Sequence, residues 1–185
     1  MNIVGKFFKH LFRVCKHKFW VFYYSCHFGI PWRGLVHDLS KFSPVEFWSG
    51  VKYYQDGISP IKLEKADTGY STAWLHHKGR NKHHWEYWTD FHNGIQISVK
   101  IPWKYLLEMT ADFLAAGRTY TGKTGKNLYI SEYSWLRTEK NTMIIHPSSL
   151  LFLNAILWRL SESGIKNIRP YLTGLKDSYE KIGSR

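Results

Sequence analysis

Apolar side chains recur at helical spacing along most of this sequence, and this periodicity restricts the possible folds more than any other feature. The clearest stripe covers residues 6–28 and stops at Gly29, a residue suited to ending a helix. Only residues 95–101 alternate between apolar and polar side chains, as a half-buried strand does. The pattern therefore predicts an all-α fold, a compact helical bundle.

Proline, glycine and capping signals predict where the other helices begin and end. Ser43-Pro44-Val45-Glu46 has the form of a capping box, which predicts a helix from residue 44 to about residue 55. Residues 56–70 and 117–128 are rich in Gly, Lys, Pro or Thr, and we expect loops there. Further helices are predicted from Pro31 through the His37-Asp38 pair and over residues 71–79, 102–116, 131–139, 149–163 and 167–182.

The length and the net charge set the scale of the protein and the kind of partner it favours. The 185 residues suffice for one domain with a full core, and no repeat or linker divides them. Lys and Arg number 26 against 14 Asp and Glu, which gives a net charge of +12. Such a surface favours anionic partners such as nucleotides, nucleic acid or phosphate esters, although a basic surface can also serve solubility alone.

The two cysteines and the basic N-terminal segment bear on the compartment. Cys15 and Cys26 lie eleven residues apart in one predicted helix, or roughly 16 Å, so they cannot form a disulfide with each other. This indicates a reducing compartment, and we expect a cytoplasmic location. The apolar run at residues 19–24 is too short to span a bilayer, and no small-residue cleavage site follows it. We expect an amphipathic core helix, with a peripheral membrane helix as the alternative.

An adjacent histidine and aspartate, His37-Asp38, is the first candidate for chemistry. An imidazole and a carboxylate side by side can both reach one divalent cation. Lys41 follows one turn after His37 if the segment is helical, so its ammonium could face an anion held by the metal. A salt bridge from Lys41 to Glu46 or Glu108 is the structural alternative.

A dense group of histidines is the second candidate. Residues 76–84 contain four of them, His76, His77, His83 and His84, next to a predicted helix end. Adjacent histidines point in different directions, so we expect only one of each pair to bind a metal. The alternative is a surface tract that binds metal adventitiously.

A carboxylate on an otherwise apolar helix is the third candidate. Asp112 lies in the middle of the predicted helix 102–116, where a charge is costly unless it is paired or bound to a metal. Glu108 precedes it by one turn on the same face. A buried salt bridge from Asp112 to Arg118 is the alternative.

A phosphate-loop pattern, Gly-x-x-x-x-Gly-Lys-Ser/Thr, also occurs at residues 117–124. Such a loop needs a strand before it and a helix that starts at its lysine, whereas a predicted helix precedes this stretch. We interpret it as an ordinary loop, in which Lys123 and Lys126 could still contact an anionic substrate.

Taken together, these residues resemble the HD-domain superfamily of metal-dependent phosphohydrolases. The matching residues are His17, His37, Asp38, Lys41, His77 and Asp112. The sequence looks closer still to a small, largely uncharacterised family of HD-like proteins from bacteria and phages, on the stretches 34–47, 73–88 and 108–118. The resemblance covers roughly residues 10–150. It implies one HD-like domain over residues 1–185, with a metal-site core at about 10–120 and C-terminal helices at about 131–182.

The resemblance also implies roles for individual residues. It assigns a first metal ion to His17, His37, Asp38 and Asp112, and a second ion to His77 and one of His83 or His84; whether His76 or His77 is the ligand stays open. This donor set suits one or two divalent ions of Mn, Fe, Co, Ni or Zn, with Mg also conceivable. Lys41 and Arg118 are candidates to hold a phosphate, and Glu108 or Glu46 could orient water or a ligand histidine.

The function expected from this resemblance is hydrolysis of a phosphate ester, in the first instance a nucleotide, by a metal-activated water. One alternative is a di-iron oxygenase, because the same ligands with two iron ions activate dioxygen in that superfamily. A second alternative is a basic protein that binds single-stranded nucleic acid through its cations and its aromatic residues, which make up 17% of the chain.

Overall fold

The computed structural model describes residues 1–182, which form nine α-helices, three 3₁₀ turns and one β-hairpin. The all-α prediction is therefore confirmed. The helices are α1 (Ile3–Phe28), α2 (Pro31–Val36), α3 (Pro44–Lys52), α4 (Pro60–Thr68), α5 (Thr72–Lys78), α6 (Trp103–Thr121), α7 (Gly125–Glu139), α8 (Pro147–Ser163) and α9 (Ile168–Lys181). The strands are β1 (Thr89–His92) and β2 (Ile95–Ser98).

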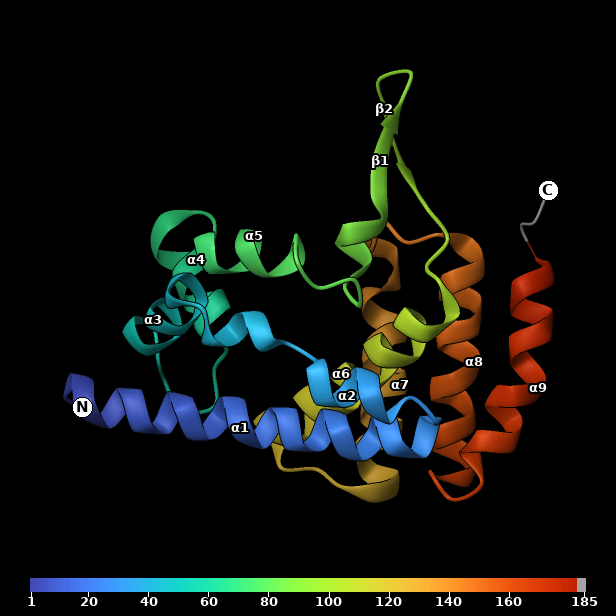
Figure 1. Cartoon of the computed structure of the whole chain (residues 1–185), viewed down its shortest axis with the longest axis horizontal. Coiled ribbons are helices and arrows are strands. Elements are labelled where there is room, and N and C mark those ends of the chain that lie inside the picture. Colours follow the sequence, from blue (N-terminus) through green and yellow to red (C-terminus); the bar gives the residue numbers. More distant parts are fainter. Residues whose placement is uncertain (183–185) are drawn as a thin grey trace.

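The long helix α1 runs along one edge of the molecule and supports the other elements (Figure 1). Its first turn is capped by Asn2, whose side-chain oxygen accepts a hydrogen bond from the backbone N–H of Gly5. It ends at Gly29, which adopts φ 78°, a left-handed conformation that glycine takes without strain. In Figure 1, α3–α5 lie over the N-terminal half of α1, and α7–α9 lie beyond its C-terminal half.

The segment around the His-Asp pair is not helical, contrary to the prediction. Helix α2 ends at Val36, His37 is extended with ψ 133°, and Asp38 takes the left-handed conformation with φ 53°. Leu39–Phe42 then forms a short 3₁₀ turn. Helix α2 stops here because His37 and Asp38 are buried, and the contacts of Asp38 with His17 and His77 fix the local conformation.

Two predicted loops contain helices. Residues 56–70 include α4, which starts with Pro60 at its first position and ends at Gly69 with φ 81°. Residues 117–128 include the last turn of α6 and the start of α7, separated by a short turn at Gly122. No strand precedes the phosphate-loop pattern at 117–124 in this described region, so the interpretation against such a loop holds.

The hairpin formed by β1 and β2 projects away from the helical body, on the side opposite α1 (Figure 1). Its two-residue turn is Asn93-Gly94, in which both residues have positive φ, 51° and 76°. The predicted strand at 95–101 therefore corresponds to β2, and the turn signal before it is confirmed.

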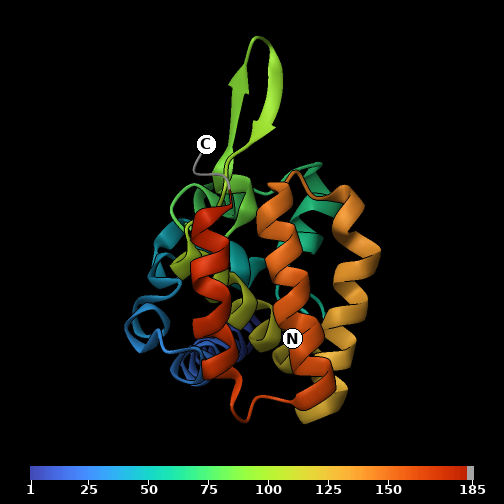
Figure 2. The same ribbon diagram turned by 90° about the vertical axis from the view of Figure 1, so that its right-hand side faces the viewer.

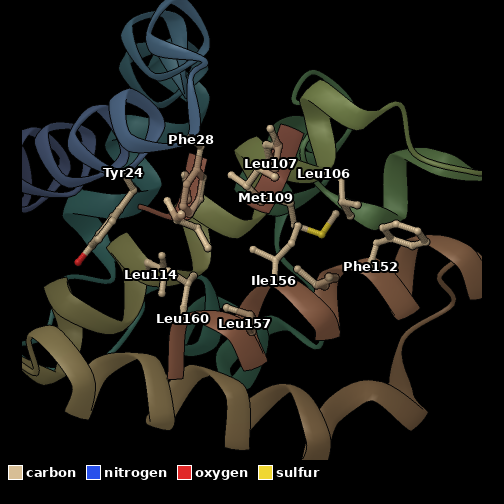
Figure 3. Packing of buried hydrophobic residues seen from close by; sticks show 14 of the residues in the cluster. Tyr24, Phe28, Leu106, Leu107, Met109, Leu114, Phe152, Ile156, Leu157 and Leu160 are labelled. Atoms are coloured by element: carbon tan, nitrogen blue, oxygen red, sulfur yellow. The ribbon is translucent and has the colours of Figure 1, made fainter. Parts of the chain in front are cut away.

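The main core lies where α6 and α8 pack together with the C-terminal half of α1 (Figure 3). Figure 2 shows α7, α8 and α9 side by side over this core, with α1 and α2 at the edge of the molecule. Side chains that fill it are Tyr24, Phe28, Leu106, Leu107, Met109, Leu114, Phe152, Ile156, Leu157 and Leu160. This packing fixes α6 beside α1, and it thereby sets the distance between the polar residues that the two helices share.

The two cysteines, Cys15 and Cys26, are both free and exposed, in agreement with their spacing on one helix. Within residues 1–182, no helix has the length and apolar character needed to cross a membrane.

Candidate metal centre

Five separate segments bring buried polar side chains to one place between α1 and α6. The middle of α1 supplies His17, the turn after α2 supplies His37 and Asp38, and the middle of α6 supplies Glu108 and Asp112. The last turn of α5 and the turn after it add His77, His83 and His84. His37 is only 1% exposed and Asp38 only 3%, so the cluster lies inside the protein.

The first group consists of His17, His37, Asp38 and Asp112, whose donor atoms all lie within 4.8 Å of one another. Nε2 of His17 lies 3.0 Å from Oδ1 of Asp112, and Nε2 of His37 lies 3.5 Å from the same oxygen. Nε2 of His37 is also 3.2 Å from Oδ2 of Asp38. These are the four residues that the resemblance assigns to a first ion.

The second group consists of Asp38, His77, His83 and His84, again with donor atoms within 4.8 Å of one another. Nε2 of His77 and Nε2 of His83 each lie 3.4 Å from Oδ1 of Asp38. Both His83 and His84 belong to the group, whereas only one of them was expected to. Asp38 is common to the two groups and turns one carboxylate oxygen toward each.

Glu108 lies behind the cluster and holds two of its histidine rings. Its Oε1 is 3.1 Å from Nδ1 of His37 and 3.4 Å from Nδ1 of His83. Its Oε2 accepts a hydrogen bond from Nε of Arg33 at 2.8 Å and forms an ion pair with Nη2 at 2.6 Å. Glu108 thus fits the predicted role of orienting a ligand histidine, and each ring that donates through Nδ1 turns Nε2 toward the cluster.

Glu46 holds two further histidine rings, those of the adjacent residues His76 and His77 on α5. Its Oε2 lies 2.7 Å from Nδ1 of His77, and its Oε1 lies 2.7 Å from Nδ1 of His76. Of the two rings, only that of His77 reaches Asp38 and belongs to the second group. The geometry therefore favours His77 as the metal ligand. The His76 ring contacts the other carboxylate oxygen of Glu46.

The charges of the cluster compensate one another. Burial opposes ionisation of Asp38, but the nearby His37, Lys41 and His77 hold the pKa of its carboxyl well below the ordinary value. Burial likewise opposes the charge on Glu108, yet hydrogen bonds from His37 and His83 lower its pKa to about 2. Both carboxylates are therefore ionised at neutral pH, as metal binding requires.

The histidines divide into two kinds. Burial and the charge of Lys41 lower the pKa of His17 to about 4, and burial also lowers the pKa values of His83 and His84. These rings are neutral near pH 7 and keep a lone pair for a metal. Burial acts in the same direction on His37, but Asp38, followed by its other carboxylate partners, raises its pKa well above the ordinary value.

Lys41 points into the cluster, although the chain brings it there without the helical turn that was predicted. Its Nζ lies 2.6 Å from Oδ2 of Asp38, a partner different from both Glu46 and Glu108. This contact raises the pKa of Lys41, with burial acting against it. Its side chain is 27% exposed, and Lys41 lines the adjoining cavity.

The structure does not bring Arg118 to the cluster. Its guanidinium carbon lies 3.3 Å from the centroid of the Trp20 ring, near the end of α6, and Arg118 does not line the cavity beside the cluster. A salt bridge between Asp112 and Arg118 is also not formed, because Asp112 faces His17 and His37 instead.

A cavity of about 200 Å³ opens beside the cluster between α1, α3, α5 and α6. The cluster contributes His17, His77, His84 and Asp112 to its wall. The remaining wall includes the cations Lys41 and Arg13, the aromatic residues Trp74 and Tyr120, and His10. The cavity therefore gives a small molecule access to the cluster, between positive charges and aromatic rings.

Two residues of this region, Arg33 and His10, were not predicted from the sequence. Arg33 pairs with Glu108 from the end of α2, and His10 lines the cavity from α1. Burial lowers the pKa of His10 to about 4. Neither residue is part of a motif; only the need of a buried Glu108 for a cation could have directed attention to Arg33.

The donor atoms of the two groups could hold a metal ion. Within the described residues, the buried Nε2 atoms of His17, His37, His83 and His84 and the Oδ1 atom of Asp38 have no partner with hydrogen-bond geometry, although Oδ1 of Asp112 lies 3.0 Å from Nε2 of His17. Buried polar atoms are rarely left in this state, and here they all point to one small region. Imidazole nitrogen together with carboxylate oxygen is the donor set of Mn, Fe, Co, Ni and Zn sites.

No curated protein and no solved structure matches the chain. A family model described as a family of unknown function, DUF5662, matches residues 6–159. This stretch contains every residue of the two metal-binding groups and most of the helical core. The chain therefore belongs to this family of unknown function, DUF5662.

Proposed function

We propose that this protein is a metal-dependent phosphohydrolase of the HD type, acting on a small phosphate ester in the cytoplasm. The observation that carries the proposal is the pair of buried histidine and aspartate groups that share Asp38. Carboxylates behind the rings, Glu108 and Glu46, support it, since such outer partners fix ligand histidines in metal enzymes.

A divalent transition metal in these groups would lower the pKa of a bound water and polarise a phosphoryl oxygen. Side chains of the protein would orient the metal ligands and bind the substrate. Glu108 and Glu46 keep the Nε2 atoms of His37, His83 and His77 directed inward. Lys41 offers an ammonium at the boundary between cluster and cavity, where it can hold a phosphate oxygen.

The cavity supports a nucleotide as the substrate. Lys41 and Arg13 supply positive charge, and Trp74 and Tyr120 offer rings against which a base can stack. A volume of about 200 Å³ is below the usual range for drug-sized ligands, so only the phosphate end of a nucleotide would be enclosed. We therefore expect a monophosphate or a similarly short ester as the substrate.

The experiment that tests this proposal begins with elemental analysis of the purified protein. Protein stripped with a chelator is then reloaded separately with Mn, Fe, Co, Ni, Zn or Mg, and release of inorganic phosphate is measured over a panel of nucleotides. Asp112→Asn serves as the inactive variant. Metal binding without phosphate release from any nucleotide, under conditions where the fold is intact, would contradict the hydrolase.

A di-iron oxygenase remains the second candidate, and the shared Asp38 favours it as well, because two ions joined by one carboxylate suit either chemistry. Two iron ions per chain, an absorption band in the near ultraviolet and consumption of dioxygen with an added organic substrate would support the oxygenase. For the nucleic-acid alternative, binding that weakens steeply with salt but is unaffected by metal removal would be the evidence.

A further inference from the structure

Helix α1 carries a line of exposed aromatic residues on the face opposite the metal centre. Phe8, Phe12, Phe19 and Phe22 follow at the alternating steps of three and four that keep side chains on one stripe, with Cys15 between them. Phe8 is 62% exposed, Phe12 70% and Phe19 59%. The buried residues of the same helix lie on its other side; they include His10, Val14, His17, Val21 and Tyr24.

The neighbouring helix extends this apolar surface. Gly34 brings α2 into contact with α1, since a Cβ atom at this position would lie 2.8 Å from Cα of Phe22. The side chains of Trp32 and Leu35 on α2 are 68% and 51% exposed. In Figure 2 the two helices lie together at one edge of the molecule, away from α7 and α8. A lone exposed phenylalanine needs no explanation, but several on one edge indicate a binding surface.

The charge that α1 and α2 contribute to this edge is positive. Residues 1–37 contain no Asp or Glu, and they contain six basic residues, Lys6, Lys9, Arg13, Lys16, Lys18 and Arg33. Lys16 is exposed beside Cys15 on the flank of the stripe. No carboxylate in the described part of the chain forms an ion pair with it. Lys9 flanks Phe8 in the same way, although it contacts Asp56.

We propose that this face of α1, the Phe stripe, docks the protein onto the surface of an anionic lipid membrane. Phenylalanine and tryptophan partition into the headgroup boundary, and flanking lysines are attracted to anionic headgroups. Pairing of two Phe stripes from two copies is less favourable, because it brings Lys16 near its counterpart and α1 offers no acidic residue to compensate it. A lipid surface supplies the missing negative charge.

The docked helix lies in the plane of the membrane and does not cross it. This agrees with the fact that no helix within residues 1–182 can span a bilayer. The metal centre contacts α1 from the opposite side, through His17, so binding to lipid leaves the cluster and its cavity in place. The proposal therefore does not depend on the function proposed above.

Flotation of the full-length protein with lipid vesicles tests the proposal. At low salt we expect the protein to float with phosphatidylcholine vesicles that contain phosphatidylglycerol, and to bind pure phosphatidylcholine at least about 10-fold more weakly. Phe12→Ser with Phe19→Ser should weaken binding by another ~10-fold or more. The matched control is Phe91→Ser on β1, because Phe91 is also 70% exposed but lies on the hairpin. Circular dichroism melting confirms that each variant is folded.

The two native cysteines allow a second, independent measurement. An environment-sensitive fluorophore on Cys15, with Cys26→Ser, should shift to the blue and become protected from an aqueous quencher when anionic vesicles are added. The same label on Thr138→Cys, with both native cysteines replaced by serine, should not respond, because Thr138 is exposed near the end of α7, and α7 and α1 lie on opposite sides of the molecule in Figure 2.

Three results would overturn the proposal. The first is no flotation with anionic vesicles at low salt, and the second is equal loss of binding in the Phe91 control. The third is a dimer that Phe12→Ser with Phe19→Ser dissociates, detected by analytical ultracentrifugation, together with no vesicle binding. That result would identify the Phe stripe as a contact between copies of the chain.

Discussion

Oε1 of Glu108 lies 3.1 Å from Nδ1 of His37, 71 residues away in the sequence. Because Glu108 is ionised, it accepts the hydrogen bond, and the ring must donate from Nδ1. The other ring nitrogen, Nε2, is thereby directed at Asp38 and Asp112. Glu108 thus decides which nitrogen of His37 can bind a metal, although Glu108 belongs to neither of the two groups that share Asp38.

Glu108→Gln should weaken metal binding without abolishing it. The amide no longer carries the charge that orients His37 and His83, and loss of such an outer partner typically costs 10- to 100-fold in affinity. Isothermal titration of the metal-free protein measures the change. Glu162→Gln, at an exposed position near the end of α8, is the control and should leave the affinity unchanged. Equal affinity in both variants would remove Glu108 from the metal site.

Asp38→Asn and Asp112→Asn should differ in metal stoichiometry. Asp38 belongs to both groups of donor atoms, whereas Asp112 belongs to one. We expect Asp38→Asn to lose all tightly bound metal and Asp112→Asn to keep the ion of the second group. Metal per chain, determined by plasma mass spectrometry after gel filtration, distinguishes them. If the two variants retain the same amount, Asp38 is not shared.

Lys41→Ala should keep its metal and lose turnover. If Lys41 holds the phosphate of the substrate, its removal costs about 1.5–4 kcal/mol of transition-state binding, or roughly 10- to 1000-fold in rate. Removing the ammonium at 2.6 Å from Asp38 should not reduce metal affinity, since a cation there competes with the metal. Metal content, melting temperature and rate are measured on one sample. A less stable variant with full turnover would show that Lys41 only pairs with Asp38.

Gly34→Ala should destabilise the fold by about 1–3 kcal/mol, because the added methyl group has no room. The Cβ atom of the new alanine would lie 2.6 Å from Cβ of Ser25 and 2.8 Å from Cα of Phe22, so α2 would have to move away from α1. Gly174→Ala on α9 is the matched control, because its Cβ meets nothing within 4 Å and should be neutral or slightly stabilising. Urea unfolding measures both, and equal effects would contradict the close contact of α1 and α2.

Glu132 on α7 should make stability depend on pH. Burial raises its pKa from 4.5 to about 7, so the folded state binds this proton more tightly than the unfolded state does. The free energy of unfolding should therefore fall as pH rises from about 4.5 to about 7 and change little above that. Glu132→Gln should remove this slope and stabilise the protein at pH 8 by roughly 1–3 kcal/mol, as one pKa unit is worth about 1.4 kcal/mol. If the free energy of unfolding of the variant still falls over this pH range, groups other than Glu132 cause the pH dependence.

The sequence predicted the structure best where a few neighbouring residues determine the local conformation or the need for a partner. Gly29 and Asn93-Gly94 fix the end of α1 and the hairpin turn through their backbone conformation, and the Ser71 side chain caps the start of α5. Asp112 could be recognised because a lone carboxylate on an apolar helix needs a partner. In each case the physical cause lies within a few residues of the signal.

The predictions failed where distant contacts decide the local structure. The chain around Asp38 leaves the helix because its side chain must reach histidines from α1 and α5. Whether His76 or His77 faces Asp38 depends on Glu46, which comes from another helix. Arg118 follows Asp112 by less than two turns of the same helix, yet it packs on Trp20. Spacing along one segment contains none of this information.

The order of the contributing segments has a consequence for how the protein matures in the cell. The cluster takes its donor atoms from positions between His17 and Asp112, and the last of them comes from the middle of α6. During synthesis, the histidines of α1 and α5 therefore emerge from the ribosome before the aspartate and the helix that will enclose them. An ion in the first group, which includes Asp112, must therefore wait until α6 has been made and has packed against α1.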